Sequence, residues 1–263
     1  MKILLSNDDG LYAPGIVLLA NRLAEIGHCV VVVAPDRERS GAGHSITTEH
    51  PLYLRKTSVS GYSKNVETYK SNGTPSDCVM LGLYRVLSDA DLVLAGINSG
   101  PNLGCDVFYS GTAAAAREAA FEKRRAMALS LCLSSKTKEE HYETAVAVSE
   151  ILVAGAEDLF EEGRETFLNV NIPNIPLERL KGFRSTFTGR RRYRDRVLDC
   201  ASPGRDKMYW LRGTPQEEEE LEGSDVKAVM NDFVALSFLQ YDTTDYKQNE
   251  HLGKNLATKI KLK

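Results

Sequence analysis

The sequence predicts an α/β fold in which helices cover both faces of a mostly parallel β-sheet. Strand patterns and helix patterns alternate along roughly the first two thirds of the chain, which is typical of parallel strands joined by helical crossovers. The second observation is the run Cys29–Ala34, whose sequence CVVVVA is entirely apolar. A strand without alternation is expected to be buried on both faces of its sheet.

The first three elements follow from short local signals. Lys2–Ser6 is an apolar run and predicts the first strand. The following helix is expected to open at Pro14, because proline suits the first helical position, and to end at Gly27. Cys29–Ala34 is then the second strand. The apolar stripe of the helix consists of Ile16, Leu19, Leu23 and Ile26.

The next segment changes character before the helical pattern returns. Residues 46–72 are expected to form an antiparallel excursion, because apolar and polar positions alternate there between glycine-containing turns. Thr74 is a typical N-cap residue, Pro75 suits the first helical position and Asp77 lies in the first turn. These residues predict a second helix, and Asp91–Ile97 predicts the strand after it.

Two more helix and strand pairs complete the alternating region. An alanine-rich helix is expected at Ala113–Phe121, followed by a strand at Ala126–Leu133. A long helix is then expected at Glu140–Phe160, and a further strand at Phe167–Ile172. This order predicts a parallel sheet covered on both faces.

The last third of the chain breaks this rhythm. Residues 186–225 are charged and poor in core residues, whereas Phe233–Tyr241 is one more apolar strand. We therefore expect a catalytic core at 1–185 and a C-terminal extension at 186–263, within one structural unit. A lone apolar strand would leave an unpaired edge, and exchange of this strand between subunits would cover it.

Composition narrows the classes of function. The net charge is -3 and the sequence pI is about 6.0, so there is no overall basic field to attract duplex nucleic acid or anionic lipid. No apolar run reaches membrane-spanning length, and the polar Asn7–Asp9 follows the first apolar run too closely for a signal peptide. The five scattered cysteines favour a reducing cytoplasm over a disulfide or zinc framework.

The chemistry is expected at one edge of the sheet. In open parallel sheets, ligands bind beyond the carboxyl ends of the strands, which selects the loops after the predicted strands. The first such loop contains Asp8 and Asp9. Adjacent carboxylates repel each other unless a cation lies between them, and Mg²⁺ takes oxygen ligands. The alternative is an Asx turn in which one aspartate caps the next helix.

Two further loops bring polar residues to the same edge. Ser40 supplies a hydroxyl after the second strand, and Asn98 supplies an amide oxygen that Mg²⁺ accepts. Ser110, Gly111 and Thr112 open a helix, whose free N–H groups and dipole attract an anion. Each feature alone is consistent with an ordinary turn or N-cap, but together they predict a metal and phosphate site.

Two other classes of function compete with this interpretation. In a dinucleotide-binding oxidoreductase, Asp36 at the end of the second strand would hold a ribose. The first loop, however, lacks the G-x-G-x-x-G pattern and places two negative charges where a pyrophosphate would lie. A noncatalytic nucleotide-binding or scaffold protein stays open, and a turnover assay separates it from an enzyme.

Five segments within residues 1–121 match, in order, the motifs of one known family. They are Ile3–Gly10 with Ala13–Gly15, Ala34–Gly41, Gly73–Val79, Gly96–Asn102 and Tyr109–Thr112. On these segments the chain resembles the SurE family of stationary-phase survival proteins. The resemblance implies a Rossmann-like core and a 5′/3′-nucleotidase that some members combine with exopolyphosphatase activity.

The resemblance also implies a cofactor and an assembly. It implies one divalent ion per subunit, Mg²⁺ or Mn²⁺, and a cytoplasmic homodimer or homotetramer with exchanged C-terminal segments. Asp242 matches an aspartate of the family, but Tyr246 stands where many members carry a histidine. The implied metal ligands are Asp8, Asp9, Ser40 and Asn98.

Phosphoryl-transfer chemistry then assigns the roles. Asp8, Asp9 and Asn98 are the predicted catalytic residues, and a water that is bound to the metal or oriented by Asp9 attacks the phosphorus in line with the leaving nucleoside. Whether Asp9 is instead a covalent nucleophile stays open. The predicted substrate-binding residues are Asn102, Ser110, Gly111 and Thr112.

Overall fold

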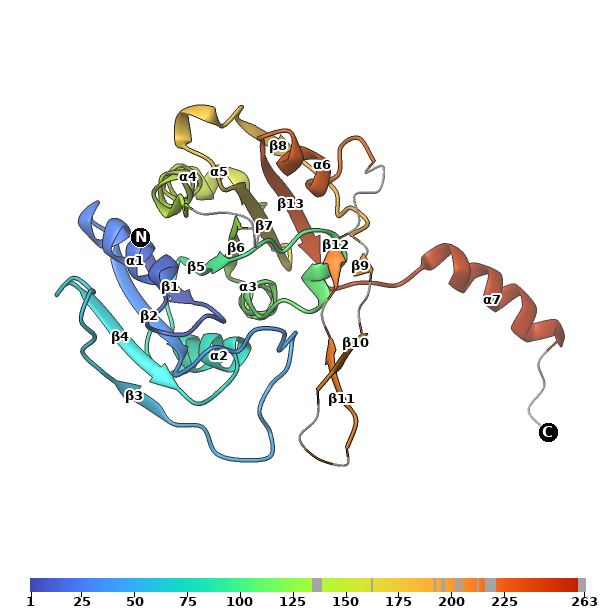
Figure 1. Cartoon of the computed structure of the whole chain (residues 1–263), viewed down its shortest axis with the longest axis horizontal. Helices are drawn as coiled ribbons and strands as arrows, with labels where there is room; N and C mark the ends of the chain where they lie inside the picture. The colour runs from blue at the N-terminus through green and yellow to red at the C-terminus, as the bar shows by residue number, and fades with distance from the viewer. Residues whose placement is uncertain are drawn as a thin grey trace.

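The computed structural model confirms the predicted α/β class (Figure 1). It describes residues 1–133, 139–161, 163–191, 193–194, 197–201, 204, 206–211, 213–215 and 221–259. Most of the loop after Leu133 therefore lies outside the described residues. The main sheet consists, in spatial order, of β3 (Leu54–Lys56), β4 (Val66–Ser71), β2 (Cys29–Pro35), β1 (Lys2–Ser6), β5 (Leu92–Ser99), β6 (Arg125–Cys132), β7 (Thr166–Pro173), β13 (Val234–Gln240) and β8 (Phe183–Ser185).

The strand order contains one point at which the direction of chain progression reverses. All neighbours from β4 across to β7 pair in parallel. From β1 the chain builds towards β2 and β4, and it then returns to the other side of β1 to add β5, β6 and β7. The carboxyl ends of β1 and β5 therefore diverge at a topological switch point, where open α/β sheets bind their ligands.

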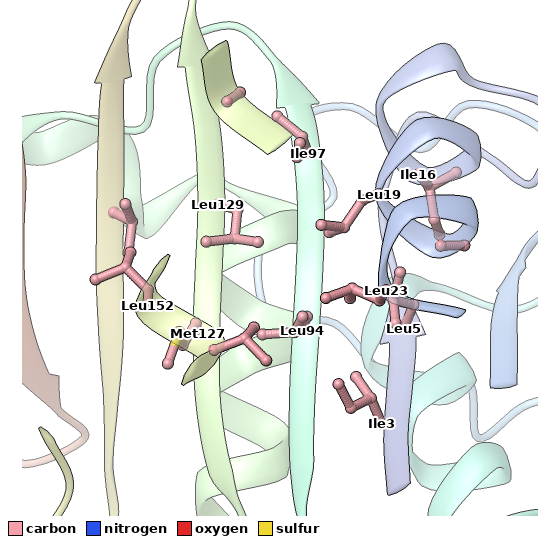
Figure 2. Close-up of a cluster of buried hydrophobic side chains, with 14 of the residues drawn as sticks. Ile3, Leu5, Ile16, Leu19, Leu23, Leu94, Ile97, Met127, Leu129 and Leu152 are labelled. Atoms are coloured by element: carbon pink, nitrogen blue, oxygen red, sulfur yellow. The ribbon is translucent and has the colours of Figure 1, made fainter. Parts of the chain in front are cut away.

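Helices cover both faces of the sheet and make three layers. On one face lie α1 (Pro14–Glu25) and α4 (Tyr142–Ala154), and on the other lie α2 (Pro75–Arg85) and α3 (Gly111–Phe121). Figure 2 shows Leu19 and Leu23 of α1 directed at the strands that carry Leu5 and Leu94. These leucines are fully buried, and burial of each contributes about 1.5–3 kcal/mol.

The predicted start of α2 is confirmed in atomic detail. The Thr74 hydroxyl accepts a hydrogen bond from the Asp77 backbone N–H at 3.1 Å, and the Asp77 carboxylate accepts one from the Thr74 N–H at 2.8 Å. This reciprocal pair is a capping box. Asp77 also accepts from the backbone N–H of Thr47 at 3.0 Å, so the same carboxylate fixes the loop that precedes β3.

Two predictions of secondary structure were wrong in part. The long helix predicted at Glu140–Phe160 ends at Ala154, and a short helix, α5 (Ala156–Leu159), follows Gly155. The antiparallel excursion is confined to β3, because β4 pairs in parallel with β2 and belongs to the main sheet. Apolar periodicity continues through both regions, so the pattern alone did not reveal the break or the pairing partner.

The C-terminal region returns to the core and then leaves it. Strand β13 pairs antiparallel with β7 and parallel with β8, so the sheet continues past the predicted boundary at residue 185 and the apolar strand is not a lone edge. The other elements are η1 (Gly104–Phe108), η2 (Leu177–Arg179), β9 (Tyr193–Arg194), β10 (Val197–Cys200), β11 (Met208–Leu211), β12 (Thr214–Pro215), α6 (Asp225–Met230) and α7 (Tyr246–Lys259).

A hairpin and a helix project from the body of the molecule (Figure 1). They are the antiparallel β10–β11 hairpin and helix α7, which the sequence did not predict because its residues are largely polar. Among the described residues, no helix combines the length and the apolar character that crossing a membrane requires.

Candidate active site

A cleft of about 450 Å³ opens at the switch point, beyond the carboxyl ends of β1 and β5. Loops that follow β1, β2 and β5 line it, together with the segment that leads into α3. The structure thereby brings together residues that are up to about a hundred positions apart in the sequence. Six of the predicted site residues line this cleft, namely Asp8, Asp9, Ser40, Asn98, Asn102 and Ser110.

The turn after β1 leaves both aspartates available to a ligand. Asn7 forms the Asx-type turn, because its side chain accepts from the Gly10 N–H at 3.2 Å and donates to the Gly10 carbonyl at 2.9 Å. Gly10 has a φ of +93°, which favours glycine. The N-cap of α1 is Ala13, without a side-chain hydrogen bond. The alternative in which Asp8 or Asp9 caps that helix is therefore wrong.

Asp8 is held by the first turn of α3. Its side chain is buried, and the Thr112 hydroxyl donates a hydrogen bond of 2.5 Å to its Oδ1. Burial raises the pKa of Asp8, while Thr112 and the backbone amide of Gly111 act in the opposite direction. A Cβ at Gly111 would lie 2.8 Å from the Asp8 Cβ, so glycine permits this close approach.

These contacts give Gly111 and Thr112 a role that the sequence did not predict. Thr112 donates a hydrogen bond to Asp8, and Gly111 leaves space for the Asp8 side chain. Neither residue is among those that line the cleft. Their contact with a substrate phosphate stays a prediction. Ser110 does line the cleft, where it is the N-cap of α3 and its hydroxyl accepts from the Ala113 N–H at 2.9 Å.

Asp9 lies closer to solvent than Asp8, and its pKa is raised towards neutral pH. Its Oδ2 accepts a hydrogen bond of 3.1 Å from the Ser99 N–H of the β5 loop. Burial raises the pKa of Asp9 to about 6, and the negative charges of Asp8 and Glu38 add to the effect. Two partly desolvated carboxylates side by side are stabilised most effectively by a cation between them.

Ser40 and Asn98 complete a set of oxygen donors. The Ser40 hydroxyl donates to Glu38 at 2.6 Å, which leaves the lone pairs of its oxygen for a further contact. The Asn98 amide nitrogen donates to the Gly100 carbonyl at 2.9 Å, so the amide oxygen is the atom that is left for a cation. Two carboxylates, one amide oxygen and one hydroxyl fit a hard divalent ion such as Mg²⁺ or Mn²⁺.

Three of the cleft residues that were not predicted as site residues carry charged or aromatic side chains. Glu38 and Asp106 add carboxylates, and Tyr109 is an exposed aromatic side chain at the rim. Asp106 is paired with Arg191 at 2.5 Å and accepts from the Tyr193 hydroxyl at 2.5 Å, so part of the C-terminal region is fixed to the cleft wall. Only the three-dimensional pairing reveals this connection.

The charge of the cleft is strongly one-sided. The residues that line it include four carboxylates and, among the described residues, no lysine or arginine. Arg191 is already engaged by Asp106, so neutralisation of a phosphate there would rely on a bound cation and on N–H donors. Asp242 does not line the cleft, and it accepts hydrogen bonds from the Tyr246 hydroxyl and the Thr244 N–H in the exposed segment before α7.

Comparison with known proteins identifies the family. The family model described as Survival protein SurE matches residues 3–195. The chain is 41% identical to 5′-nucleotidase SurE of Synechococcus elongatus, over 97% of this chain and 100% of the relative. It is 40% identical to 5′-nucleotidase SurE of Legionella pneumophila, over 99% of this chain and 98% of the relative.

A solved structure supports the same assignment. The crystal structure of the SurE protein from Aquifex aeolicus superposes with a TM-score of 0.80 at 38% sequence identity. The match covers 97% of this chain and 99% of the other, so it includes the core and the C-terminal region. The chain belongs to the SurE family.

Proposed function

We propose that the chain is a metal-dependent phosphomonoesterase that hydrolyses nucleoside 5′-monophosphates, and also 3′-monophosphates, to nucleoside and phosphate. The observation that carries the proposal is the convergence of Asp8, Asp9, Ser40 and Asn98 on one cleft at the switch point. The name 5′-nucleotidase of the relatives, which match this chain over nearly its whole length, supports the choice of substrate.

The protein residues have separate tasks in this proposal. Asp8, Asp9, Ser40 and Asn98 would hold one Mg²⁺ or Mn²⁺, which when bound supplies the positive charge that the cleft lacks. Asn102 and Ser110 direct hydrogen-bond donors at the phosphate oxygens and orient the phosphorus. Gly111 and Thr112 keep Asp8 in place from the first turn of α3.

In this proposal, Asp9 either orients the attacking water or is itself the attacking nucleophile. It is held by the Ser99 N–H through one oxygen, which leaves the other carboxylate oxygen to accept a hydrogen bond from a water. A carboxylate in this position orients the water for in-line attack and accepts its proton, while the nucleoside oxygen leaves on the opposite side. The departing oxygen takes a proton from solvent, and Asp9 returns its proton to solvent, so the protons balance. In the covalent alternative, the same oxygen attacks phosphorus directly.

The first experiment measures release of inorganic phosphate from a panel of nucleoside 5′- and 3′-monophosphates, with Mg²⁺ or with Mn²⁺. Tripolyphosphate belongs in the panel, because the end of a polyphosphate chain presents a similar terminal phosphate and tests exopolyphosphatase activity. We expect turnover of the 5′-monophosphates. Nucleotide binding without any phosphate release would favour the noncatalytic alternative over the proposed enzyme.

We also propose that the chain acts as a homodimer or homotetramer in the cytoplasm. The β10–β11 hairpin exposes Leu198, Trp210 and Leu211, and helix α7 projects from the body (Figure 1). Exposed apolar side chains on projecting elements are suited to contact with a second subunit. The five cysteines are free thiols, which agrees with a reducing compartment.

Removal of residues 242–263 is expected to shift the protein from a dimer or tetramer towards a monomer. The deletion starts at 242 because α6 and β13 belong to the core, so an earlier end point would destroy the sheet. Light scattering at micromolar concentration measures the mass of the intact and truncated chains. A monomeric mass for the intact protein would contradict the proposed assembly.

A further inference from the structure

Four polar side chains form a buried network beneath the floor of the cleft. Ser130 lies on β6, Asn169 and Asn171 lie on β7, and Asn102 follows β5. The first three are at most 1% exposed, and Asn102 is 6% exposed. Ser130 is the direct neighbour of Asn171 in the parallel register, and Asn169 lies two positions away on the same face of β7.

The hydrogen bonds among these four residues meet at Asn102, and the Asn171 amide oxygen also accepts from the Cys132 thiol at 3.8 Å. The Asn171 amide oxygen accepts from the Asn102 backbone N–H at 2.9 Å, and the Asn171 amide nitrogen donates to the Asn102 carbonyl at 3.1 Å. Asn169 donates to the same carbonyl at 3.0 Å. The Asn102 side-chain nitrogen in turn donates to the Ser130 hydroxyl at 2.8 Å. Backbone and side chain of Asn102 are therefore fixed separately.

The composition of β7 makes this arrangement unusual. The alternate positions of the strand carry the buried apolar side chains of Leu168, Val170 and Ile172. Two carboxamides in such a strand are costly to bury, and the Asn169 amide oxygen is left without a hydrogen-bond partner among the described residues. Apolar side chains would suit the stability of the sheet better, so the network points to a task at the cleft.

The loop held by this network is the one that connects the two halves of the candidate site. The Gly100 N–H donates to the Leu131 carbonyl of β6 at 3.0 Å, between Asn98 on one side and Asn102 on the other. Asn98 belongs to the oxygen donor set, and Asn102 lines the same cleft, where it is predicted to bind the phosphate. Residues of β6 and β7 thus hold this loop in place through hydrogen bonds.

We propose that Asn171 is a positioning residue that acts through Asn102 on the bound phosphate. The proposal rests on the proposed phosphatase function. A carboxamide has two N–H groups, and Ser130 accepts from one of those of Asn102. With the backbone clamped by Asn171, the second N–H is held towards the cleft for a nonbridging phosphate oxygen. Preorganised donors of this kind act without reorientation during the reaction.

The experiment is a double-mutant cycle on phosphate affinity. Calorimetry measures binding of inorganic phosphate, in the presence of Mg²⁺, to the wild type, Asn171→Leu, Asn102→Ala and the double variant. Ser130→Ala perturbs the network in a second way, because it removes the hydroxyl that accepts from the Asn102 side chain with little change in volume. Hydrolysis of a nucleoside 5′-monophosphate is measured on the same proteins, and thermal melting shows that each is folded.

Asn174→Leu is the matched control. Asn174 makes the same type of two-bond clamp, since it accepts from the His141 N–H at 2.8 Å and donates to the Glu139 carbonyl at 2.8 Å. It belongs to the segment after β7 and does not line the cleft. Its loss removes the same two kinds of hydrogen bond as loss of Asn171, at a half-buried position, and phosphate affinity should be unchanged.

The expected pattern is specific to positioning through Asn102. Asn171→Leu and Asn102→Ala should each weaken phosphate binding about tenfold, and the double variant should be no weaker than either one. Additive losses, or an equal loss in Asn174→Leu, would overturn the proposal. If phosphate binding shows the expected pattern while the wild type hydrolyses no nucleotide, the positioning role stands and the proposed function fails. Absence of phosphate binding in the wild type overturns the positioning role as well.

Discussion

Removal of divalent cations with a chelator is expected to abolish phosphate release from nucleoside monophosphates. The cleft contains Asp8, Asp9, Glu38 and Asp106, and no lysine or arginine lines it among the described residues. A phosphate dianion that approaches these carboxylates is repelled, and in a partly desolvated cleft the repulsion is only weakly screened. Without a cation, both binding and attack should therefore fail.

Addition of excess Mn²⁺ or Mg²⁺ should restore the activity of the chelated protein. Thermal melting of the chelated sample is the control, because it separates loss of the ion from loss of the fold. Full activity in excess chelator would contradict the metal hypothesis. It would also require another source of positive charge, such as the Arg191 guanidinium that pairs with Asp106 at the cleft wall.

Asp9→Asn is expected to lower the rate of hydrolysis by at least about 10²-fold, the scale for loss of one preorganised group at a reacting centre. The substitution keeps the shape of the side chain and removes the charge that, in the proposed mechanism, would hold the cation and accept the proton of the attacking water. Asp89→Asn is the matched control, since Asp89 is exposed, pairs with Lys2 at the surface and is not among the residues that line the cleft.

The same substitution is expected to stabilise the metal-free protein. Burial and the charge of Asp8 raise the pKa of Asp9 to about 6, above the value of a free carboxyl. The folded state therefore holds this proton more tightly, and metal-free stability falls as the pH rises from about 4 to about 6. Above that window, Asp9→Asn removes a penalty of about 1–2 kcal/mol.

Thermal unfolding of metal-free wild type and Asp9→Asn at pH 5 and pH 7.5 tests this sign. The variant should gain more over the wild type at pH 7.5 than at pH 5, because the carboxyl of the wild type is mostly protonated at the lower pH. Near wild-type turnover together with unchanged pH dependence would show that Asp9 has been assigned the wrong role.

The elements that could be predicted were those whose structure depends on residues close by in the sequence. Lys2–Ser6 and Cys29–Ala34 form buried strands because their composition leaves no polar face, and Thr74 caps a helix through contacts within three residues. Asp8 and Asn98 could be brought to one site because the carboxyl ends of parallel strands share an edge. These inferences needed no knowledge of the register between strands.

Features that depend on register or on distant pairing were not predictable. The contacts of Asn171 can be recognised only when β7 is placed beside β6. Ser130 is then its neighbour in the sheet, and Asn102 forms hydrogen bonds with both residues. Asp106 meets Arg191 across more than eighty residues. The pairing of β13 with β7 and β8 likewise depends on tertiary packing, because an apolar strand does not specify its neighbours in the sheet.

The contacts of the first turn of α3 show the same limit. An exposed helix start predicts anion binding, and Ser110 lies in the cleft as that rule requires. Thr112 instead turns its hydroxyl to Asp8, and Gly111 provides the space for that carboxylate. The sequence could place these residues near the site, but only side-chain packing divides them between substrate contact and support.

Stepwise loading of the metal-free protein with Mn²⁺ tests the central claim most directly. Bound Mn²⁺ and the rate of phosphate release from a nucleoside 5′-monophosphate are measured on the same samples, with Asn98→Ala for comparison. We predict one ion per chain, a rate proportional to occupancy, and weaker binding in Asn98→Ala with an unchanged melting temperature. Full phosphate release at zero occupancy, or Mn²⁺ binding that is indifferent to Asn98, would contradict a metal-dependent nucleotidase centred on Asp8 and Asp9.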